Sequence, residues 1–299
     1  MRASLVVNPR AGRNRGAVAA SRARTEFQRA GWEVATAVTL CAGDAERLAR
    51  QAAAQSFDAV LACGGDGTLS QALAGLLDTG IPAGLIPCGT GNDFARTIGL
   101  SRNPAVAARQ LIPGRTADVD LLEINDGLLW SVNIMGVGFD AQVTLRMNHH
   151  GPLVAGPVGY LFAVAQELIA YRSTPVRLTV DGETWEGEAL LLAVANARSY
   201  GAGMKIAPKA EIADGLLDVV LVQHVSRVAF LRNLPRVFRG THLTHPAVRT
   251  WRGREVTIET FEQSRHVLVD GDVQCETPVH VRVSQHRAKL LWPSPLRGR

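Results

Sequence analysis

Two glycine-rich segments carry the residue types that handle phosphate groups. The first, AVLACGGDGT (Ala59–Thr68), is an apolar run that ends in glycines around Asp66. The second, PCGTGNDFAR (Pro87–Arg96), follows another apolar run and contains Asp93. Glycines let a backbone turn sharply and bring its N–H groups against a phosphate, and the start of the next helix favours anions. Two such loops side by side would offer backbone donors and two carboxylates to a Mg²⁺–phosphate complex.

Each segment also has a plainer interpretation as a strand-to-helix turn without a ligand. For GGDG alone, this alternative is as strong as a phosphate site. The chain contains no GxxxxGK[ST] and no spaced GxGxxG pattern, so Walker-type and dinucleotide-binding sites are not favoured. A second loop of the same kind makes two ligand-free turns a poor explanation, and we favour a magnesium–nucleotide site.

The two loops belong to a region in which short apolar runs alternate with helical patterns. Strands are predicted at Ser4–Val7, Val34–Leu40, Ala59–Ala62 and Ala83–Ile86, and helices at 16–30 and 44–55. This alternation is typical of parallel βαβ units, whose ligands bind at the carboxyl ends of the strands. After about residue 126, short β-rich runs separated by turns predict a mostly antiparallel β domain.

A chain of 299 residues is longer than one core usually needs, so we expect two domains. The first is an α/β domain with a mostly parallel sheet over residues 1–125, to which the tail 287–299 returns with a strand at Lys289–Trp292. The second is a mostly antiparallel β-sandwich over residues 126–286.

Composition narrows the partners without choosing among them. The formal charge of +5 favours anionic partners such as nucleotides or acidic lipids. The scattered tryptophans suggest no base-stacking platform, so we expect no nucleic acid.

The cysteines lack metal-ligand spacing and predict reduced thiols in a cytoplasmic protein, with Cys63 and Cys88 as small buried apolar groups. The longest uncharged stretch falls short of the roughly 20 residues of a spanning helix. The sequence is compatible with a homodimer but does not decide the oligomeric state.

The motifs together resemble the diacylglycerol kinase catalytic-domain family, in particular its bacterial soluble lipid kinases. The resemblance spans nearly the whole chain in the family's order. Besides GGDGT and GTGNDFAR it rests on NPRAG (Asn8–Gly12), NIMGVGFD (Asn133–Asp140), GAGMKIAP (Gly201–Pro208), DGLLD (Asp214–Asp218) and VDGD (Val269–Asp272). GGDGT also occurs in NAD kinases and phosphofructokinases, whereas the other motifs are more selective. The resemblance implies an NAD-kinase/diacylglycerol-kinase-like fold that uses ATP and Mg²⁺ to phosphorylate a lipid hydroxyl, with diacylglycerol as the first choice.

The resemblance also implies roles for matching residues. Contacts to ATP fall on Asn8, Thr39, Gly64, Gly65, Asp66, Gly67, Thr68, Gly89, Thr90, Asn92 and Asp93. The carboxylates around the catalytic magnesium are Asp66, Asp93 and Asp120. A second, structural magnesium would bind Asp214 and the main-chain oxygens of Glu211 and Leu216. The pair Asp214–Gly215 fits an ordinary hairpin turn equally well, so the second metal stays open.

One departure from the family concerns the catalytic base. Bacterial relatives usually carry Asp-Gly-Glu, whose glutamate is the proposed base for the acceptor hydroxyl. This chain has Asp272 at the third position, which shortens the side chain by about one carbon–carbon bond. A carboxylate can still act as a general base, and Asp270 could share or take that role. A β-turn without catalytic function is the alternative for this motif.

A basic region favours contact with an anionic membrane. No acidic residue occurs between Val219 and Arg254. A helix predicted over Ser226–Phe238 places arginines on one face and apolar residues on another: Arg232, Arg236 and Arg239 against Phe230, Leu234 and Phe238. Pro235 is expected to kink it. Such a helix can rest on acidic lipids, and a solvated helix with paired arginines fits equally well. The apolar segment 152–165 is favoured as a core helix over a lipid-pocket wall.

Two other functions fit the same residues. One is an NAD-kinase-like enzyme that phosphorylates a small molecule, which the motifs after GGDGT disfavour. The other is a non-catalytic nucleotide or lipid sensor on a kinase scaffold. The presence of Asp66, Asp93, Asp120 and Asp272 favours an enzyme over the sensor.

Overall fold

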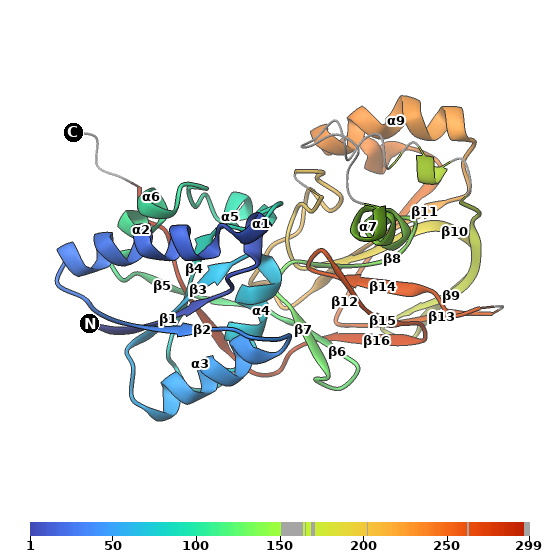
Figure 1. Ribbon diagram of the computed structural model, residues 1–299. Coiled ribbons are helices and arrows are strands. Elements are labelled where there is room, and N and C mark those ends of the chain that lie inside the picture. The colour runs from blue at the N-terminus through green and yellow to red at the C-terminus, as the bar shows by residue number, and fades with distance from the viewer. Residues whose placement is uncertain (151–163, 165, 169–170, 202, 262, 296–299) are drawn as a thin grey trace. The chain divides into compact units, whose positions relative to one another are not determined.

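The computed structural model describes residues 1–150, 164, 166–168, 171–201, 203–261 and 263–295. The chain divides into two compact units (Figure 1). Unit 1 comprises Met1–Leu121 with Ser284–Arg299, and unit 2 comprises Leu122–Val283.

Unit 1 is built on a six-stranded sheet with helices on both faces (Figure 1). The strand order is β2 (Glu33–Val38), β1 (Arg2–Val7), β3 (Ala59–Gly64), β4 (Ala83–Pro87), β17 (Ala288–Leu291) and β5 (Thr116–Val119). All pairs are parallel except β17 with β5. The predicted strand of the C-terminal tail is therefore found here, between β4 and β5.

The order of these strands places a topological switch point at one edge of the sheet. From β1 the chain crosses to β2 on one side and then to β3 on the other, so the winding direction reverses between β1 and β3. In open α/β sheets, ligands bind outside the carboxyl ends of the strands at such a reversal. The strands that end there are buried and apolar, as a sheet covered on both faces requires.

Two pairs of helices cover the sheet of unit 1. Helix α2 (Gly16–Arg29) packs against α6 (Pro104–Leu111), and α3 (Asp44–Ala54) packs against α4 (Asp66–Ala74). Figure 1 shows α2 and α6 on one face and α3 on the other. Two short helices, α1 (Ala11–Asn14) and α5 (Asp93–Thr97), lie in the loops that follow β1 and β4. The mostly parallel α/β fold expected for this region is confirmed.

Unit 2 is an eleven-stranded antiparallel sheet that curls into a sandwich. Its strands are β6 (Leu122–Ile124), β7 (Leu129–Ser131), β8 (Ile134–Gly138), β9 (Thr174–Val180), β10 (Glu183–Ala195), β11 (Leu217–Gln223), β12 (Val248–Gly253), β13 (Glu255–Thr260), β14 (His266–Val269), β15 (Asp272–Glu276) and β16 (Val279–Val283). The 13-residue strand β10 pairs with β9 along its first half and with β8 and β11 along its second. The expected antiparallel sandwich is confirmed.

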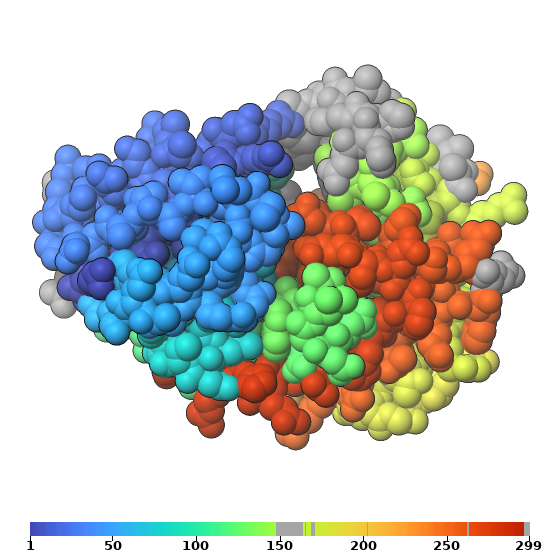
Figure 2. Space-filling model, turned by 60° about the horizontal axis from the view of Figure 1, so that its bottom comes forward, coloured from blue at the N-terminus to red at the C-terminus, as the bar shows by residue number. Residues whose placement is uncertain are grey.

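Alternation along the strands of unit 2 separates a core from a polar face. In β9, Val176, Leu178 and Val180 point into the core, while Arg177 faces out and pairs with Glu186 at 2.7 Å. Burying every second side chain is the usual pattern of a sheet with one wet face. In Figure 2, residues of β13 to β16 lie at the surface, in orange and red.

Helices form a second layer on the other side of this sheet. Helices α7 (Phe139–His150) and α9 (Arg227–Arg239) and the 3₁₀ turn η1 (His242–Thr244) pack there over a second apolar cluster. The helix predicted over Ser226–Phe238 is thus found, and it continues through Pro235. Most of the predicted segment 152–165 lies outside the described residues, although Val164 belongs to this cluster. No described helix is long and apolar enough to cross a bilayer.

Candidate functional site

Three loops meet at the carboxyl edge of the sheet in unit 1. They follow β1, β3 and β4, which are neighbours in the sheet, so their starting points lie side by side. The N–H of Asn8 donates to the carbonyl of Cys63 at 2.9 Å, and the N–H of Cys88 donates to the carbonyl of Gly64 at 2.9 Å. Thr39 follows β2 at the same edge, where its N–H donates to Val7. The sheet therefore gathers the segments in which the sequence places ATP.

Asp66 joins the second loop to the third. Its Oδ2 accepts the backbone N–H of Asp93 at 3.0 Å and that of Phe94 at 3.3 Å. The bonds pin the start of α5 against the start of α4, and both carboxylates are buried. Asp93 in turn pairs with Arg96 on the next turn of α5. The predicted meeting of the two glycine loops is thus confirmed by direct hydrogen bonds.

Two glycines allow the loop backbones to touch. Gly12 has a φ of +58°, and a Cβ built on it would lie 1.9 Å from the carbonyl oxygen of Cys88. A Cβ on Gly89 would lie 2.7 Å from the Cα of Gly65. Any side chain at either position would push the loops apart, since such distances are far below contact. These glycines are required by the packing of the loops whether or not a ligand is bound.

Burial separates the parts of the loops that build the site from the parts that can meet a ligand. The buried residues are Gly64, Asp66, Thr68, Asn92 and Asp93. The accessible or half-buried ones are Asn8, Thr39, Gly65, Gly67, Gly89 and Thr90. The start of α4 carries the positive end of the helix dipole, and there the N–H groups of Thr68 and Leu69 donate to the carbonyl of Gly65. Accessible backbone over a buried frame is what close binding of phosphate requires.

Asp66 and Asp93 are the two carboxylates of these loops that could hold a magnesium ion beside a nucleotide phosphate, and in the structure Asp93 is paired with Arg96. Proteins usually hold Mg²⁺ with one or two carboxylates plus the phosphates of the substrate. Asp120 follows β5 and is half-buried. Among the described residues no three His, Cys, Asp or Glu side chains are close enough to hold a metal together. The structure thus brings Asp66 and Asp93 together but does not complete a cluster with Asp120.

The predicted second magnesium site contains an arginine. Asp214 Oδ1 accepts the N–H of Leu216 at 3.0 Å, and its Oδ2 binds the guanidinium of Arg252. Arg252 Nε also lies 3.4 Å from Asp218, so one guanidinium serves two carboxylates. Burial raises the pKa of Asp218, and Arg252 partly offsets this shift. These contacts do not fit a metal held by Asp214, and we derive no role for a second magnesium.

We therefore expect the folding of unit 2 to be independent of magnesium. In the nucleotide-free protein, the Tm should be the same with Mg²⁺ and with EDTA. Arg252→Gln leaves two carboxylates without their cation, so its Tm should fall by a few degrees, since ~1 kcal/mol shifts the Tm of such a domain by about 2–4 °C. Differential scanning fluorimetry measures both effects. A clear rise of the wild-type Tm with Mg²⁺ would contradict this assignment.

The two candidate bases lie on the turn between β14 and β15. Asp270 has a φ of +49°, and its Oδ1 accepts the Ser131 hydroxyl at 2.6 Å and the Ile134 N–H at 3.4 Å. These bonds hold the turn against the start of β8. Asp272 is exposed, yet surrounding protein limits its hydration and raises the pKa of its carboxyl. The arrangement favours Asp270 as a structural residue and Asp272 as the accessible base.

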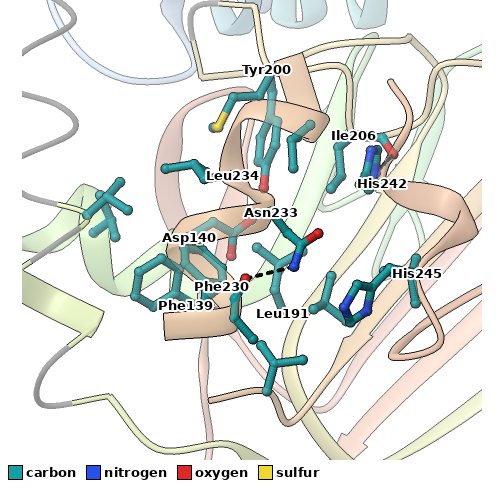
Figure 3. A pocket seen from close by; sticks show the side chains of 18 residues that line it. Phe139, Asp140, Leu191, Tyr200, Ile206, Phe230, Asn233, Leu234, His242 and His245 are labelled. Carbon is teal, nitrogen blue, oxygen red and sulfur yellow. Dashed lines mark hydrogen bonds between the residues drawn. The ribbon is translucent and has the colours of Figure 1, made fainter. Parts of the chain in front are cut away.

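An apolar cavity lies beneath α9, between α7 and the sheet of unit 2 (Figure 3). Its volume is about 800 Å³ when the open mouth is counted. Apolar lining residues include Phe139, Val143, Leu191, Phe230 and Leu234. The polar side chains bond mainly to the protein: Asn233 donates to the Ala229 carbonyl at 2.8 Å, and His242 Nε2 lies 3.0 Å from the Ile206 carbonyl oxygen. A hydrocarbon chain suits such a lining better than a sugar or a base.

Asp140 is the charged exception in this cavity. It is buried in the first turn of α7, where its Oδ1 accepts the Ala141 N–H at 2.9 Å. Figure 3 shows the Tyr200 hydroxyl directed towards it, but Oδ2 makes no hydrogen bond of normal geometry with a described residue. Burial raises the pKa of Asp140 to about 7, and the bonds from Ala141 and Tyr200 offset this only in part. The sequence assigned it no role, although an aspartate directly after an apolar strand is the signal that marked Asp66.

The raised pKa of Asp140 predicts a pH-dependent stability. Its carboxyl has an unshifted pKa of 3.8, so between about pH 4 and 7 the folded chain keeps a proton that the unfolded chain has lost. The free energy of unfolding should therefore fall as the pH rises through this window, by up to about 1.4 kcal/mol per pH unit. Asp140→Asn, a neutral side chain of the same shape, should remove that slope. Urea unfolding at several pH values tests this, and parallel curves for both proteins would refute it.

Comparisons with known proteins agree on both units. The family model described as diacylglycerol kinase catalytic domain matches residues 2–124. The model described as YegS C-terminal NAD kinase beta sandwich-like domain matches residues 133–291. The chain is thus similar to one family model over nearly all of unit 1 and to another over most of unit 2.

Relatives match along almost the full length. A diacylglycerol kinase of Mycobacterium tuberculosis (strain H37Rv) is 37% identical over 297 residues, covering 96% of this chain and 94% of the relative. A diacylglycerol kinase of Bacillus subtilis is 31% identical, covering 97% and 99%. The crystal structure of a diacylglycerol kinase from Bacillus anthracis superimposes with a TM-score of 0.78 at 26% identity, covering 97% of this chain and 96% of that one.

Proposed function

The chain belongs to the diacylglycerol kinase family and is a lipid kinase, and from this premise we propose that it transfers the γ-phosphate of ATP to the hydroxyl of diacylglycerol. The products would be phosphatidic acid and ADP. Kinases of this kind use ATP and typically a divalent metal. The observation that carries the nucleotide site is the bonding of Asp66 to the N–H groups of Asp93 and Phe94.

In this proposal the loops of unit 1 bind and orient the triphosphate. Phosphoryl transfer asks a protein mainly for positioning and for neutralisation of charge. The accessible backbone around Gly65, Gly67 and Gly89 would donate to phosphate oxygens. Asp66 and Asp93 would hold the magnesium, which neutralises charge on the phosphates when bound. The bond from Asp66 to α5 keeps both loops in place, so little reorganisation is needed when ATP binds.

The acceptor is activated in unit 2. Asp272 would take the proton of the lipid hydroxyl as its oxygen forms a bond to the γ-phosphorus, while the bond from that phosphorus to the bridging oxygen of ADP breaks. The raised pKa of Asp272 makes its carboxylate a stronger base than an ordinary aspartate. A shorter reach than glutamate requires the hydroxyl to lie closer to the main chain of the turn.

The apolar cavity beneath α9 supports a lipid acceptor. Its walls are made of aliphatic and aromatic side chains, and most of its polar groups are already bonded within the protein. We assign it to the acyl part of the substrate. Burying hydrocarbon there contributes about 0.8 kcal/mol per methylene, which favours long-chain lipids over soluble alcohols.

Label transfer from [γ-³²P]ATP tests the proposal. The purified full chain is incubated with Mg²⁺ and mixed micelles of long-chain diacylglycerol, with parallel arms containing phosphatidylglycerol, a sphingoid base or NAD. We expect label in phosphatidic acid and none in NADP. Label found only in another lipid would identify that lipid as the acceptor in place of diacylglycerol. Label in NADP would favour the NAD-kinase alternative, and no label in any arm would favour a non-catalytic sensor.

A further inference from the structure

We propose that the outer face of α9 docks onto an anionic lipid bilayer, directly above the cavity whose wall its inner face forms. The inference rests on the proposed function, which supplies the lipid substrate. The docking surface is argued from the residues of α9. Its occupant is the bilayer rather than a protein.

The inner face of α9 is accounted for by packing. Phe230, Leu234 and Val237 pack against the second apolar cluster and line the cavity. The ring of Phe230 meets that of Phe139 edge-on, with centroids 5.3 Å apart. These contacts attach the helix to the sheet without help from its remaining apolar residues.

The outer face of α9 is apolar as well, and it is exposed. Val228 is 58% exposed, Leu231 48% and Phe238 40%. With Pro235 they follow the spacing i, i+3, i+7, i+10, so they form one stripe along the helix. Three of the nine exposed large apolar side chains of the described chain lie on this helix. Exposed apolar side chains that lie together on one face mark an interaction surface, whereas singly scattered ones need no explanation.

Cations flank the stripe. Arg232 and Arg239 are exposed and make no hydrogen bond or ion pair with a described residue. Arg236 differs, because its guanidinium donates to the Thr244 hydroxyl at 2.8 Å and to the Thr241 carbonyl at 3.1 Å. The available cations are therefore Arg232 and Arg239, and Arg236 belongs to the turn after the helix.

This combination matches an anionic bilayer better than a protein partner. Apolar side chains can enter the acyl region while adjacent arginines meet lipid phosphates, which is how interfacial helices bind. No acidic residue occurs between Val219 and Arg254 to repel the headgroups. Because the cavity lies on the inner side of the same helix, docking would bring its lining next to the lipid that must enter it.

Vesicle partitioning tests the docking face in the full chain. Sucrose-loaded vesicles of phosphatidylcholine with about 30 mol% phosphatidylglycerol are compared with pure phosphatidylcholine at low salt. Leu231→Ser/Phe238→Ser should lower the partition coefficient at least about tenfold. Arg232→Gln/Arg239→Gln should lower it about fivefold per arginine on anionic vesicles only.

Matched substitutions elsewhere separate the helix from general effects. Leu128→Ser removes an apolar side chain that is 72% exposed in another part of unit 2. Arg22→Gln/Arg24→Gln removes the same number of exposed charges from α2. Both controls should partition like wild type. The proposal would be overturned if the control variants lost as much vesicle binding as the α9 variants, or if the α9 variants partitioned like wild type. It would also be overturned if the α9 substitutions changed only the oligomeric state of the protein, as measured by light scattering.

Catalysis in detergent micelles separates this inference from the proposed function. The α9 variants should keep wild-type kcat with short-chain diacylglycerol in mixed micelles, where no bilayer has to be found. Vesicle binding through α9 without phosphorylation of any lipid would refute the function and leave the docking intact. If the protein phosphorylates lipid in micelles but the α9 substitutions do not change its binding to vesicles, the docking proposal alone is refuted.

Discussion

Replacing Asp66 by asparagine is expected to lower kcat for lipid phosphorylation by at least about a hundredfold, the usual cost of removing one electrostatic contact to the reacting centre. Asparagine keeps an oxygen that can accept the N–H of Asp93, so the two loops should stay together. What it removes is the negative charge that the proposed magnesium needs. The loss is measured with saturating ATP and diacylglycerol in mixed micelles.

Asp44→Asn is the matched control for this variant. Asp44 is 7% exposed, as is Asp66, and it also lies in the first turn of a helix of unit 1. Its Oδ2 accepts the N–H groups of Leu40 and Cys41 and its Oδ1 accepts the guanidinium of Arg47, and these bonds hold the pKa of its carboxyl down at about 2. Activity of Asp44→Asn should stay within about threefold of wild type, since surface and structural substitutions act mainly on stability. If both variants lose activity equally, the charge of Asp66 has no special role.

The sequence was a good guide to features that depend on neighbours along the chain. Glycines and carboxylates directly after buried strands predicted the edge of the sheet at which Asp66 and Asp93 meet, because parallel strands end at a common edge. Cys63 and Cys88 were predicted as small buried groups, and their Sγ atoms lie 3.8 Å apart in the interior. Such predictions need only the period of a strand and the direction of a sheet.

Contacts between residues that are far apart along the chain could not be predicted from the sequence. The resemblance implied a magnesium at Asp214, with an ordinary turn as the open alternative, whereas the counter-charge of this carboxylate comes from Arg252, 38 residues later on the strand next to β11. The helix at 227–239 was predicted to present arginines on one face and Phe230, Leu234 and Phe238 on another. Phe230 and Leu234 do pack inward, whereas Phe238 lies on the exposed stripe. Helical periodicity identifies faces, but only packing decides which face meets the core.

Asp272→Asn is expected to lower kcat by about 10²–10⁴-fold, the range of a positioned general base. The amide cannot take the proton of the hydroxyl. Its size is unchanged and its position at the start of β15 is exposed, so the fold should be kept. Asp272→Glu should keep activity within about tenfold of wild type, because a longer carboxylate retains the chemistry and changes only the reach. Single-turnover measurements isolate this step from product release.

The matched control lies two residues away. Asp270→Asn can still accept the Ser131 hydroxyl and the Ile134 N–H, so the turn should persist and kcat should stay near wild type. A large loss of kcat in Asp270→Asn with none in Asp272→Asn would transfer the role of base to Asp270.

The pH dependence of the reaction gives an independent test of the same base. Desolvation raises the pKa of Asp272, so its carboxyl needs a higher pH to ionise than an ordinary aspartate does. The acid limb of kcat against pH should therefore lie above about pH 4, and activity should rise with pH through that limb because only the ionised form can accept a proton. In Asp272→Asn this limb should disappear from the residual activity. An acid limb that survives the substitution unchanged would mean that another group titrates, and Asp272 would then have no part in proton transfer.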